Sequence, residues 1–302
     1  MKELIPDALD GERVDRVVAL MTGLSRASVA GLVAAGAVRL SGRTVTTRST
    51  KVTGGSSIDV ELPGRADPEP VADPGVEVEV VYADGDVLVV DKPAGLVVHP
   101  GAGNAGGTLV QGLLARFPDL AGVGDPARPG IVHRLDKGTS GLLVVARSAP
   151  AHASLVAQLA GRSVSRRYAA LVWGWPEPPH GQVDAPIGRS RRDPTRMSVS
   201  SRGKPARTGY RVRTRFDSPQ PASLLSCRLE TGRTHQIRVH LGAIGHPVVG
   251  DARYGGVREG IVCPRPFLHA EHLAFDHPVS GERLSYSSEL AEDLRRVLDQ
   301  LA

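Results

Sequence analysis

Apolar residues near the start of the chain recur at helical spacing in two short stretches. They predict one helix over residues 14–21 and a second over residues 29–33. Gly23 breaks the pattern between them, and Ser25 is placed to cap the second helix. Gly36 suits the left-handed position at which helices commonly end. We therefore expect a pair of short helices.

Strand-like patterns follow this helix pair. Residues 41–43, Ser-Gly-Arg, have the composition of a hairpin turn between short apolar segments. Residues 58–62 alternate between apolar and polar, as a half-buried strand does. Two short helices followed by short strands predict a small α/β module over residues 12–62.

The composition changes after this module. Residues 63–75 contain four prolines and two glycines, which disfavours a regular element and predicts a semi-extended linker. Beyond it, residues 76–81 alternate and residues 87–90 are all apolar, so two strands are expected around a turn at residues 84–86.

The remainder predicts one larger domain of mixed α+β class over residues 76–302. Strand-rich segments are interspersed with helices, one of which is expected to begin at Thr108. A last helix is expected after Ser288, with leucines and a valine on one face. Its acidic residues lie in the early turns, where they interact favourably with the helix dipole.

The overall composition is that of an ordinary soluble protein. Of the 302 residues, 41% are hydrophobic and 23% are charged. No run of about eighteen apolar residues exists, so no membrane span is expected. Residues 1–7 lack the apolar core of a signal peptide. The two cysteines, Cys227 and Cys263, are far apart in sequence, and we expect reduced thiols in a cytoplasmic protein.

Positive charge is concentrated in one region. The chain has a net charge of +5, and residues 161–215 alone contain thirteen Lys and Arg against three Asp and Glu. Such a stretch is typical of a surface that binds a polyanion, because basic side chains release the counterions of phosphates. A solvated surface loop explains the charge equally well.

Two motifs suggest functions that their surroundings exclude. Residues 101–106 match a dinucleotide-binding glycine pattern, but no strand directly precedes them and no βαβ unit surrounds them. The segment His133-Arg134-Leu135-Asp136 looks like a kinase catalytic loop, yet the aspartate does not follow the arginine directly. We therefore expect neither a nicotinamide enzyme nor a kinase.

The ten histidines do not have the spacing of metal ligands. His235 and His240 are five residues apart in a segment that alternates like a strand, which would place them on opposite faces. We interpret the histidines as hydrogen-bonding residues near a polar cleft, and we expect no metal site.

Polar residues interrupt three otherwise apolar segments, residues 91–100, 128–147 and 231–251. Together these segments resemble the RluA/RluC/RluD family of pseudouridine synthases, over about residues 76–284. The middle segment is the most specific of the three. The layout is most similar to the D-type branch, which acts on large-subunit ribosomal RNA, although the C-type branch shares it.

The resemblance implies a catalytic set of Asp136, Tyr168 and Arg238. Pseudouridine formation breaks the bond from ribose C1′ to uracil N1 and rejoins the base through C5, which requires a carboxylate but no cofactor. Asp136 matches the catalytic aspartate, and Arg238 matches the cation that keeps it ionised. Tyr168 matches a residue that stacks on uracil, with a hydroxyl available for transfer of the C5 proton. Arg166 stands where the family often has lysine.

RNA contacts are expected on both sides of this set. The module of residues 12–62 is similar to an S4 RNA-binding domain, although a generic helical cap is the alternative. By family resemblance Arg134 would enter the space left by a flipped uridine, and Arg233 would hold RNA or the loop. The residues expected to contact phosphates are Arg26, Arg39, Lys51, Arg189, Arg191 and Arg192.

The expected partner is RNA, either large-subunit ribosomal RNA or an assembling subunit, and we expect the protein to be a monomer. Two alternatives stay open at this point. One is a synthase that acts on transfer RNA, and the other is a non-catalytic RNA-binding or ribosome-assembly factor.

Overall fold

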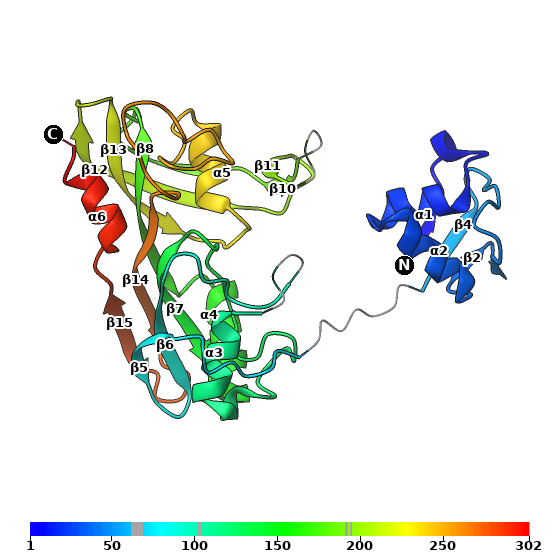
Figure 1. Cartoon of the computed structure of the whole chain (residues 1–302), viewed down its shortest axis with the longest axis horizontal. Helices are drawn as coiled ribbons and strands as arrows, with labels where there is room; N and C mark the ends of the chain where they lie inside the picture. Colours follow the sequence, from blue (N-terminus) through cyan, green and yellow to red (C-terminus); the bar gives the residue numbers. More distant parts are fainter. Residues whose placement is uncertain (62–68, 102–103, 105, 191–192, 194, 302) are drawn as a thin grey trace. The chain divides into compact units, whose positions relative to one another are not determined.

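The computed structural model describes residues 1–302 except 62–68, 102–103, 105, 191–192, 194 and 302. It divides into two compact units, Met1–Ala66 and Asp67–Ala302, each of which is described by itself. Figure 1 shows their elements in chain order.

The first unit packs two helices on a four-stranded sheet. Its elements are β1 (Lys2–Leu4), the 3-10 helix η1 (Asp7–Leu9), α1 (Val14–Thr22), α2 (Arg26–Ala34), β2 (Val38–Leu40), β3 (Arg43–Thr44) and β4 (Ser57–Val60). The sheet order is β1-β4-β2-β3. Because β1 pairs with β4, the unit begins ahead of residue 12, where the sequence pattern placed its start. Residues 63–68 of the expected linker lie outside the described residues.

Local signals in this unit agree with the structure. The Ser25 hydroxyl accepts a hydrogen bond from the Ser28 amide and caps α2. Gly36 has a φ of +71°, in the left-handed region that glycine adopts without steric cost. Val14, Val17 and other apolar residues of both helices are buried against the sheet.

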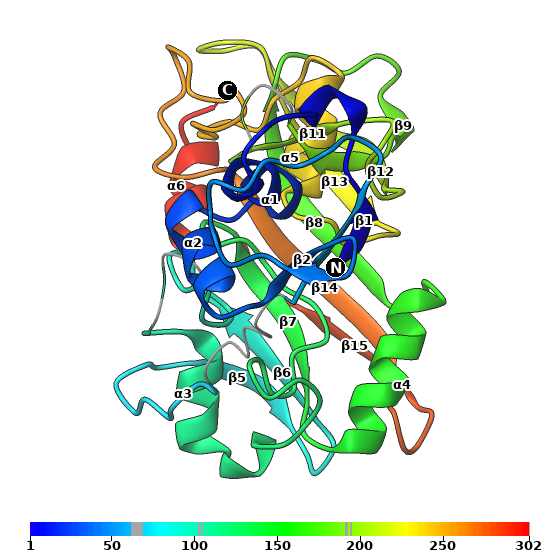
Figure 2. The ribbon, with the colours of Figure 1, turned by 90° about the vertical axis from the view of Figure 1, so that its right-hand side faces the viewer.

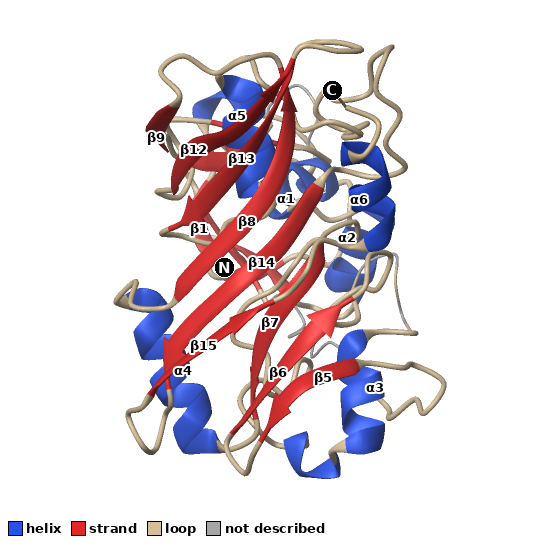
Figure 3. Cartoon of the chain, turned by 90° about the vertical axis from the view of Figure 1, so that its left-hand side faces the viewer, coloured by secondary structure: helices blue, strands red, loops and turns tan. Residues whose placement is uncertain are grey.

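The second unit is built on a nine-stranded sheet (Figure 3). Its strands are β5 (Glu79–Ala83), β6 (Val87–Lys92), β7 (Ser140–Ala146), β8 (Ser165–Trp173), β9 (His180–Asp184), β12 (Arg207–Phe216), β13 (Ala222–Leu229), β14 (Leu268–Asp276) and β15 (Arg283–Ser287). The order is β5-β6-β7-β14-β8-β13-β12-β9, and β15 pairs with β14. Among the described strands of this sheet, β7 and β14 form the only parallel pair, so the expected mixed, largely antiparallel sheet is confirmed.

Helices cover the sheet, whose central strands are buried on both faces. They are α3 (Leu109–Arg116), η2 (Pro118–Leu120), α4 (Ala149–Ala160), α5 (Gln236–Ala243) and α6 (Glu292–Leu298), and a separate pair joins β10 (Ile187–Arg189) to β11 (Met197–Val199). On β6, Leu88 and Val90 pack in the cluster that contains α3, whereas Val87 and Val89 pack in the cluster that contains α4. Thr108 caps α3, as expected.

The expectation of a strand at residues 231–241 is wrong, because this segment contains α5. Its apolar residues alternate with polar ones, which imitates a half-buried strand. All residues from Gln236 to Leu241 are nevertheless buried, and the polar ones form hydrogen bonds within the protein. For example, His240 contacts the Thr208 hydroxyl and the Ala185 carbonyl. A helix buried all round does not show the polar face on which the sequence interpretation depended.

Two further observations concern the ends and the thiols. The last helix, α6, begins at Glu292 with Ala291 as its cap, later than the expected start after Ser288. Both Cys227 and Cys263 are free, and Cys227 is buried in β13. Among the described residues no single helix is long and apolar enough to cross a membrane, and α1 with α2 would do so only as a pair bent by 115°.

Candidate active site

Asp136 lies in the loop that leads into β7. In the middle of the sheet, β7, β14 and β8 run side by side (Figures 2 and 3). Arg238 of α5 donates a hydrogen bond from Nη1 to Asp136 Oδ2 at 3.0 Å. The Asp136 side chain keeps 18% of its surface exposed. The structure therefore brings together two of the three expected catalytic residues, although they are 102 positions apart in the chain.

A second carboxylate holds Arg238 from the other side. The guanidinium donates from Nε to Asp251 Oδ2 at 2.6 Å and from Nη2 to Oδ1 at 2.9 Å. Asp251 is fully buried. Burial alone would lower the pKa of Arg238, but the hydrogen bonds of Asp251 and the charge of Asp136 raise it above its usual value. Arg238 is therefore a permanent cation in a fixed orientation.

Asp251 has a role that the sequence analysis missed. It lies within the third polar segment, directly after Gly250, but no pattern linked it to Arg238. Tyr254 and His235 were also missed as neighbours of this arginine. The Arg238 guanidinium lies over the Tyr254 ring at 5.1 Å, and the Tyr254 hydroxyl is 2.8 Å from His235 Nδ1. These contacts confine Arg238 further.

Tyr168 comes from β8 and is only 5% exposed. Burial raises the pKa of its hydroxyl to about 12, so the phenol is protonated at neutral pH. Tyr168 and Asp136 both line a cleft of about 700 Å³. The cleft therefore presents an aromatic side chain and an ionisable carboxylate to one ligand.

A buried cation and a partly buried one hold the loop that carries Asp136. Lys92 is fully buried, and its ammonium donates to the carbonyls of Pro93 at 2.8 Å, Leu96 at 2.9 Å and Lys137 at 3.5 Å. Burial lowers the pKa of Lys92 to about 8. Arg265 donates to the Gly138 carbonyl at 3.0 Å. The two carbonyls that follow Asp136 are thus each held by a cation.

The anchor at Gly138 continues into the last helix. Arg265 donates from Nε to Asp293 Oδ2 at 2.6 Å and from Nη2 to Oδ1 at 2.8 Å. It also donates to the Ser140 hydroxyl at 3.0 Å. Asp293 lies in the first turn of α6. Helix α6 therefore fixes the position of the loop that carries Asp136.

The expected RNA-binding residues of the second unit are distributed around the cleft. Arg134 lies in its lining and is exposed, and its side chain has no hydrogen bond or ion pair with another described residue. Arg233 also lines the cleft and donates to the Pro205 carbonyl at 3.1 Å. Arg189 is the last residue of β10. Arg191 and Arg192 lie outside the described residues.

In the first unit, two of the three residues expected to contact RNA phosphates form ion pairs within the protein. Arg26 donates to Asp15 at 2.9 Å, and Arg39 lies 3.3 Å from Glu61. The hydrogen bond from Arg13, followed by that from Arg26, lowers the pKa of Asp15 to about 2. Lys51 is exposed. All three cations stay accessible, since the paired arginines keep about half of their side-chain surface exposed.

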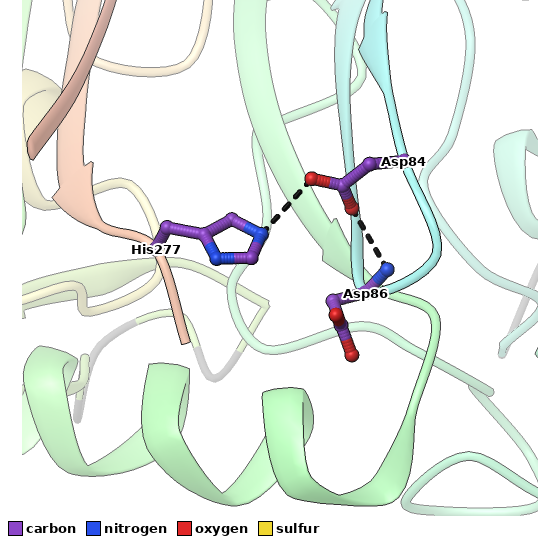
Figure 4. A group of neighbouring side chains, drawn as sticks. All are labelled: Asp84, Asp86 and His277. Atoms are coloured by element: carbon purple, nitrogen blue, oxygen red, sulfur yellow. Dashed lines mark hydrogen bonds and ion pairs between the residues drawn. The ribbon is translucent and has the colours of Figure 1, made fainter. Parts of the chain in front are cut away.

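One group of side chains in the described part of the chain has the spacing of metal ligands, namely Asp84, Asp86 and His277 (Figure 4). It lies at the turn between β5 and β6 and at the end of β14, and none of its members lines the cleft of Asp136. His277 Nε2 is 2.9 Å from Asp84 Oδ2. His277 Nδ1 accepts from the amides of Val279 and Ser280, so Nε2 carries the proton and donates it to Asp84.

Comparison with known proteins agrees with this geometry. A family model described as RNA pseudouridylate synthase matches residues 86–243, a range that includes Asp136, Tyr168 and Arg238. The chain belongs to the RNA pseudouridylate synthase family. The resemblance seen in the three polar segments is therefore confirmed.

The synthase has similar relatives over nearly its whole length. It is 44% identical to the "Ribosomal large subunit pseudouridine synthase D" of Zymomonas mobilis, over 98% of this chain and 96% of that protein. It is 48% identical to an "Uncharacterized RNA pseudouridine synthase" of Chloroflexus aurantiacus, over 99% and 92%. Among solved structures, "Human RNA Pseudouridylate Synthase Domain Containing 1" matches with a TM-score of 0.55 and 32% identity, over 71% of this chain and 84% of that one.

Proposed function

We propose that this RNA pseudouridine synthase isomerises uridines of large-subunit ribosomal RNA, with Asp136 as the nucleophile. The observation that carries the proposal is the pairing of Asp136 with Arg238 at the wall of a cleft that Tyr168 also lines. The name of the Zymomonas mobilis relative supports the choice of ribosomal RNA. Transfer RNA is the alternative substrate.

The reaction is an isomerisation in which no atom is gained or lost overall. The C1′–N1 bond of uridine breaks, the base turns, and a C1′–C5 bond forms; C5 then loses its proton and N1 gains one. Asp136 either adds to C1′ or removes the C2′ proton, and both routes require the ionised carboxylate. Arg238 holds this carboxylate in position through the hydrogen bond from Nη1 to Asp136 Oδ2.

Tyr168 is proposed to contact the uracil ring of the target uridine. Its ring supplies a stacking surface for uracil in the cleft. Since its raised pKa keeps the phenol protonated at neutral pH, Tyr168 does not begin the reaction as a base. Its hydroxyl can accept the C5 proton only if it gives its own proton to another acceptor at the same time.

The target uridine has to leave the RNA stack before it reaches Asp136, at a cost of about a few kcal/mol. Arg134 is suited to the vacated place, because it is exposed and unpaired among the described residues and its planar guanidinium stacks on bases. Arg233 and Arg189 are assigned to the surrounding RNA. The first unit, proposed to be S4-like, would contribute Arg26, Arg39 and Lys51. The protein is proposed to act as a cytoplasmic monomer.

The test replaces Asp136 by Asn and measures pseudouridine in a large-subunit ribosomal RNA transcript. The wild type is expected to release tritium from C5-tritiated uridine in this RNA, and the variant is expected to lose turnover by roughly 10⁴-fold or more while it still binds RNA. Wild-type turnover in the variant would overturn the assignment of Asp136. Modification of transfer RNA but not of the ribosomal transcript would overturn the assignment of the substrate.

A further inference from the structure

Arg166 is a buried cation that lines the cleft. It lies on β8, and only 6% of its surface is exposed. Its Nε has no hydrogen-bond partner, and the guanidinium forms no ion pair with any described residue. Three other arginines of this region meet carboxylates: Arg128 pairs with Asp125, Arg162 with Glu230, and Arg238 with Asp136 and Asp251. Arg134 and Arg233, which form no ion pair with a described residue, differ from Arg166 because they are exposed to solvent.

An unpaired charge in such a position is unfavourable. Removal of a cation from water costs free energy unless an anion or hydrogen-bond acceptors compensate it. Burial lowers the pKa of Arg166 for this reason. Since the described protein residues supply no counter-charge, the compensating anion is expected to come from a ligand in the cleft.

A second donor on the same wall has no partner either. His133 Nε2 accepts a hydrogen bond from the Val144 amide at 3.3 Å, so the ring proton is on Nδ1. This Nδ1 is buried and has no hydrogen-bond partner in the described part of the chain. Burial lowers the pKa of His133 to about 3, which keeps the imidazole neutral. His133 and Arg166 thus both line the cleft, and each has a buried N–H group without a partner among the described residues.

Arg166 lies two residues before Tyr168 on β8, so the two side chains point to the same face of the strand. Residues two apart on a strand point to the same face, about 6.6 Å apart along the strand. The Arg166 guanidinium also lies against Gly232, where an added Cβ would be 3.0 Å from Nη1. A glycine at this position therefore leaves room for the guanidinium.

We propose that Arg166, together with the Nδ1–H of His133, binds a phosphodiester oxyanion of the RNA beside the uridine that stacks on Tyr168. The inference rests on the proposed function, because it takes RNA as the ligand of the cleft. A guanidinium suits this role since it donates two parallel hydrogen bonds to a phosphate. Arg166 is then a binding residue that holds the target nucleotide in place for Asp136.

The test measures RNA affinity as a function of salt concentration for Arg166→Gln and Arg166→Lys. The logarithm of the RNA association constant falls linearly with the logarithm of the salt concentration. Loss of one phosphate contact on a single strand makes this negative slope shallower by about 0.7. Arg166→Gln is expected to show this decrease and to raise Kd by about tenfold. Arg166→Lys keeps the charge, so it is expected to keep the slope.

The matched control is Arg162→Gln, which removes a neighbouring cation that Glu230 already neutralises. It is expected to change the salt slope less than Arg166→Gln does. If Arg166→Gln does not fold, Gly232→Ala displaces the guanidinium without removing it and is expected to raise Kd about threefold. An unchanged Kd in a folded Gly232→Ala variant would contradict the proposal.

Two further results would overturn it. One is an unchanged Kd and salt slope in folded Arg166→Gln. The other is loss of kcat at saturating RNA with Kd unchanged, which would assign Arg166 to the negative charge that develops on the detached uracil. Because a phosphate contact is independent of sequence, the slope is measured with both ribosomal and transfer RNA. If Arg166 binds a phosphate, the salt slope of Arg166→Gln changes with both RNAs, even if ribosomal RNA is not the substrate. Failure of the proposed phosphate contact can therefore be distinguished from failure of the proposed substrate.

Discussion

Two polar clusters of the second unit combine carboxylates with a basic side chain, and only one of them is arranged for chemistry. In the cluster of Asp84, Asp86 and His277 (Figure 4), Asp84 Oδ1 accepts from the amides of Asp86 and Val87 at 2.8 and 2.7 Å. Oδ2 accepts from the Tyr82 hydroxyl at 2.8 Å and from His277 at 2.9 Å. This carboxylate has four hydrogen bonds, and no lone pair is left over for a ligand.

Asp136 is in the opposite situation. Among the described residues its carboxylate has one hydrogen-bond donor, Arg238, and it faces a cleft of about 700 Å³. The carboxylate that supports Arg238 is saturated instead, because Asp251 accepts two hydrogen bonds from Arg238 and one each from the amides of Arg253 and Tyr254. The comparison teaches that the carboxylate proposed to react keeps acceptors free while its supporting carboxylate is fully bonded, whereas a structural carboxylate uses all its acceptors within the fold.

The largest effect on this contrast is expected from Asp251→Asn, which weakens the support of Arg238 but leaves Asp136 in place. Misorientation of a catalytic group by about 1 Å costs roughly 10²-fold in turnover. We therefore expect single-turnover pseudouridine formation to fall by about this factor with RNA affinity retained. Wild-type turnover in the variant would show that Asp136 alone orients Arg238.

A smaller effect is expected from Asp293→Asn, which loosens Arg265 and so the Gly138 carbonyl beside the catalytic loop. We expect roughly a tenfold loss of turnover with little change in RNA affinity. The matched control is Glu292→Gln in the same turn, since Glu292 is exposed and its one ion pair with a described residue is to Arg296. Equal losses in both variants would indicate a general effect of α6 and contradict a specific anchor.

The structural cluster is expected to affect stability alone. Asp84→Asn weakens a carboxylate with four hydrogen bonds, at about 2 kcal/mol of unfolding free energy, and lowers Tm by about 4–8 °C for a domain of this size. Turnover per folded molecule is expected to be that of the wild type, as measured by calorimetry and tritium release on the same samples. A loss of turnover without a loss of Tm would reverse the comparison.

The smallest effect is expected in how the Tm difference between wild type and Asp84→Asn depends on pH. Burial acts to raise the pKa of Asp84, but the amides of Val87 and Asp86 and the hydroxyl of Tyr82 together lower it. A folded-state pKa below the unfolded value means that the stabilisation is complete above about pH 4 and is lost as the pH falls further. The Tm difference between wild type and Asp84→Asn is therefore expected to be constant from neutral pH to about pH 5 and to narrow below about pH 4. A difference that widens in acid would contradict this assignment.

Local chemistry explains which elements could be predicted from the sequence. Ser25 and Gly36 act through their own backbone and nearest turns, and the strands around residues 84–86 follow from alternation and turn residues. The α5 segment was misinterpreted, because its polar side chains are buried and satisfied by distant partners such as Thr208. Periodicity carries no information about hydrogen bonds between strands and helices that are far apart in sequence.

The candidate site divides in the same way. The polar segments of the sequence, through their family resemblance, predicted Asp136, Tyr168 and Arg238 as the catalytic residues and identified the class of reaction. Only the tertiary structure decided that Asp251 completes the support of Arg238, that Asp293 anchors the loop through Arg265, and that Arg166 has no counter-charge among the residues that the structure describes. Residue types reveal what chemistry a side chain can perform, but charge compensation depends on which groups the fold places within a few ångströms of each other.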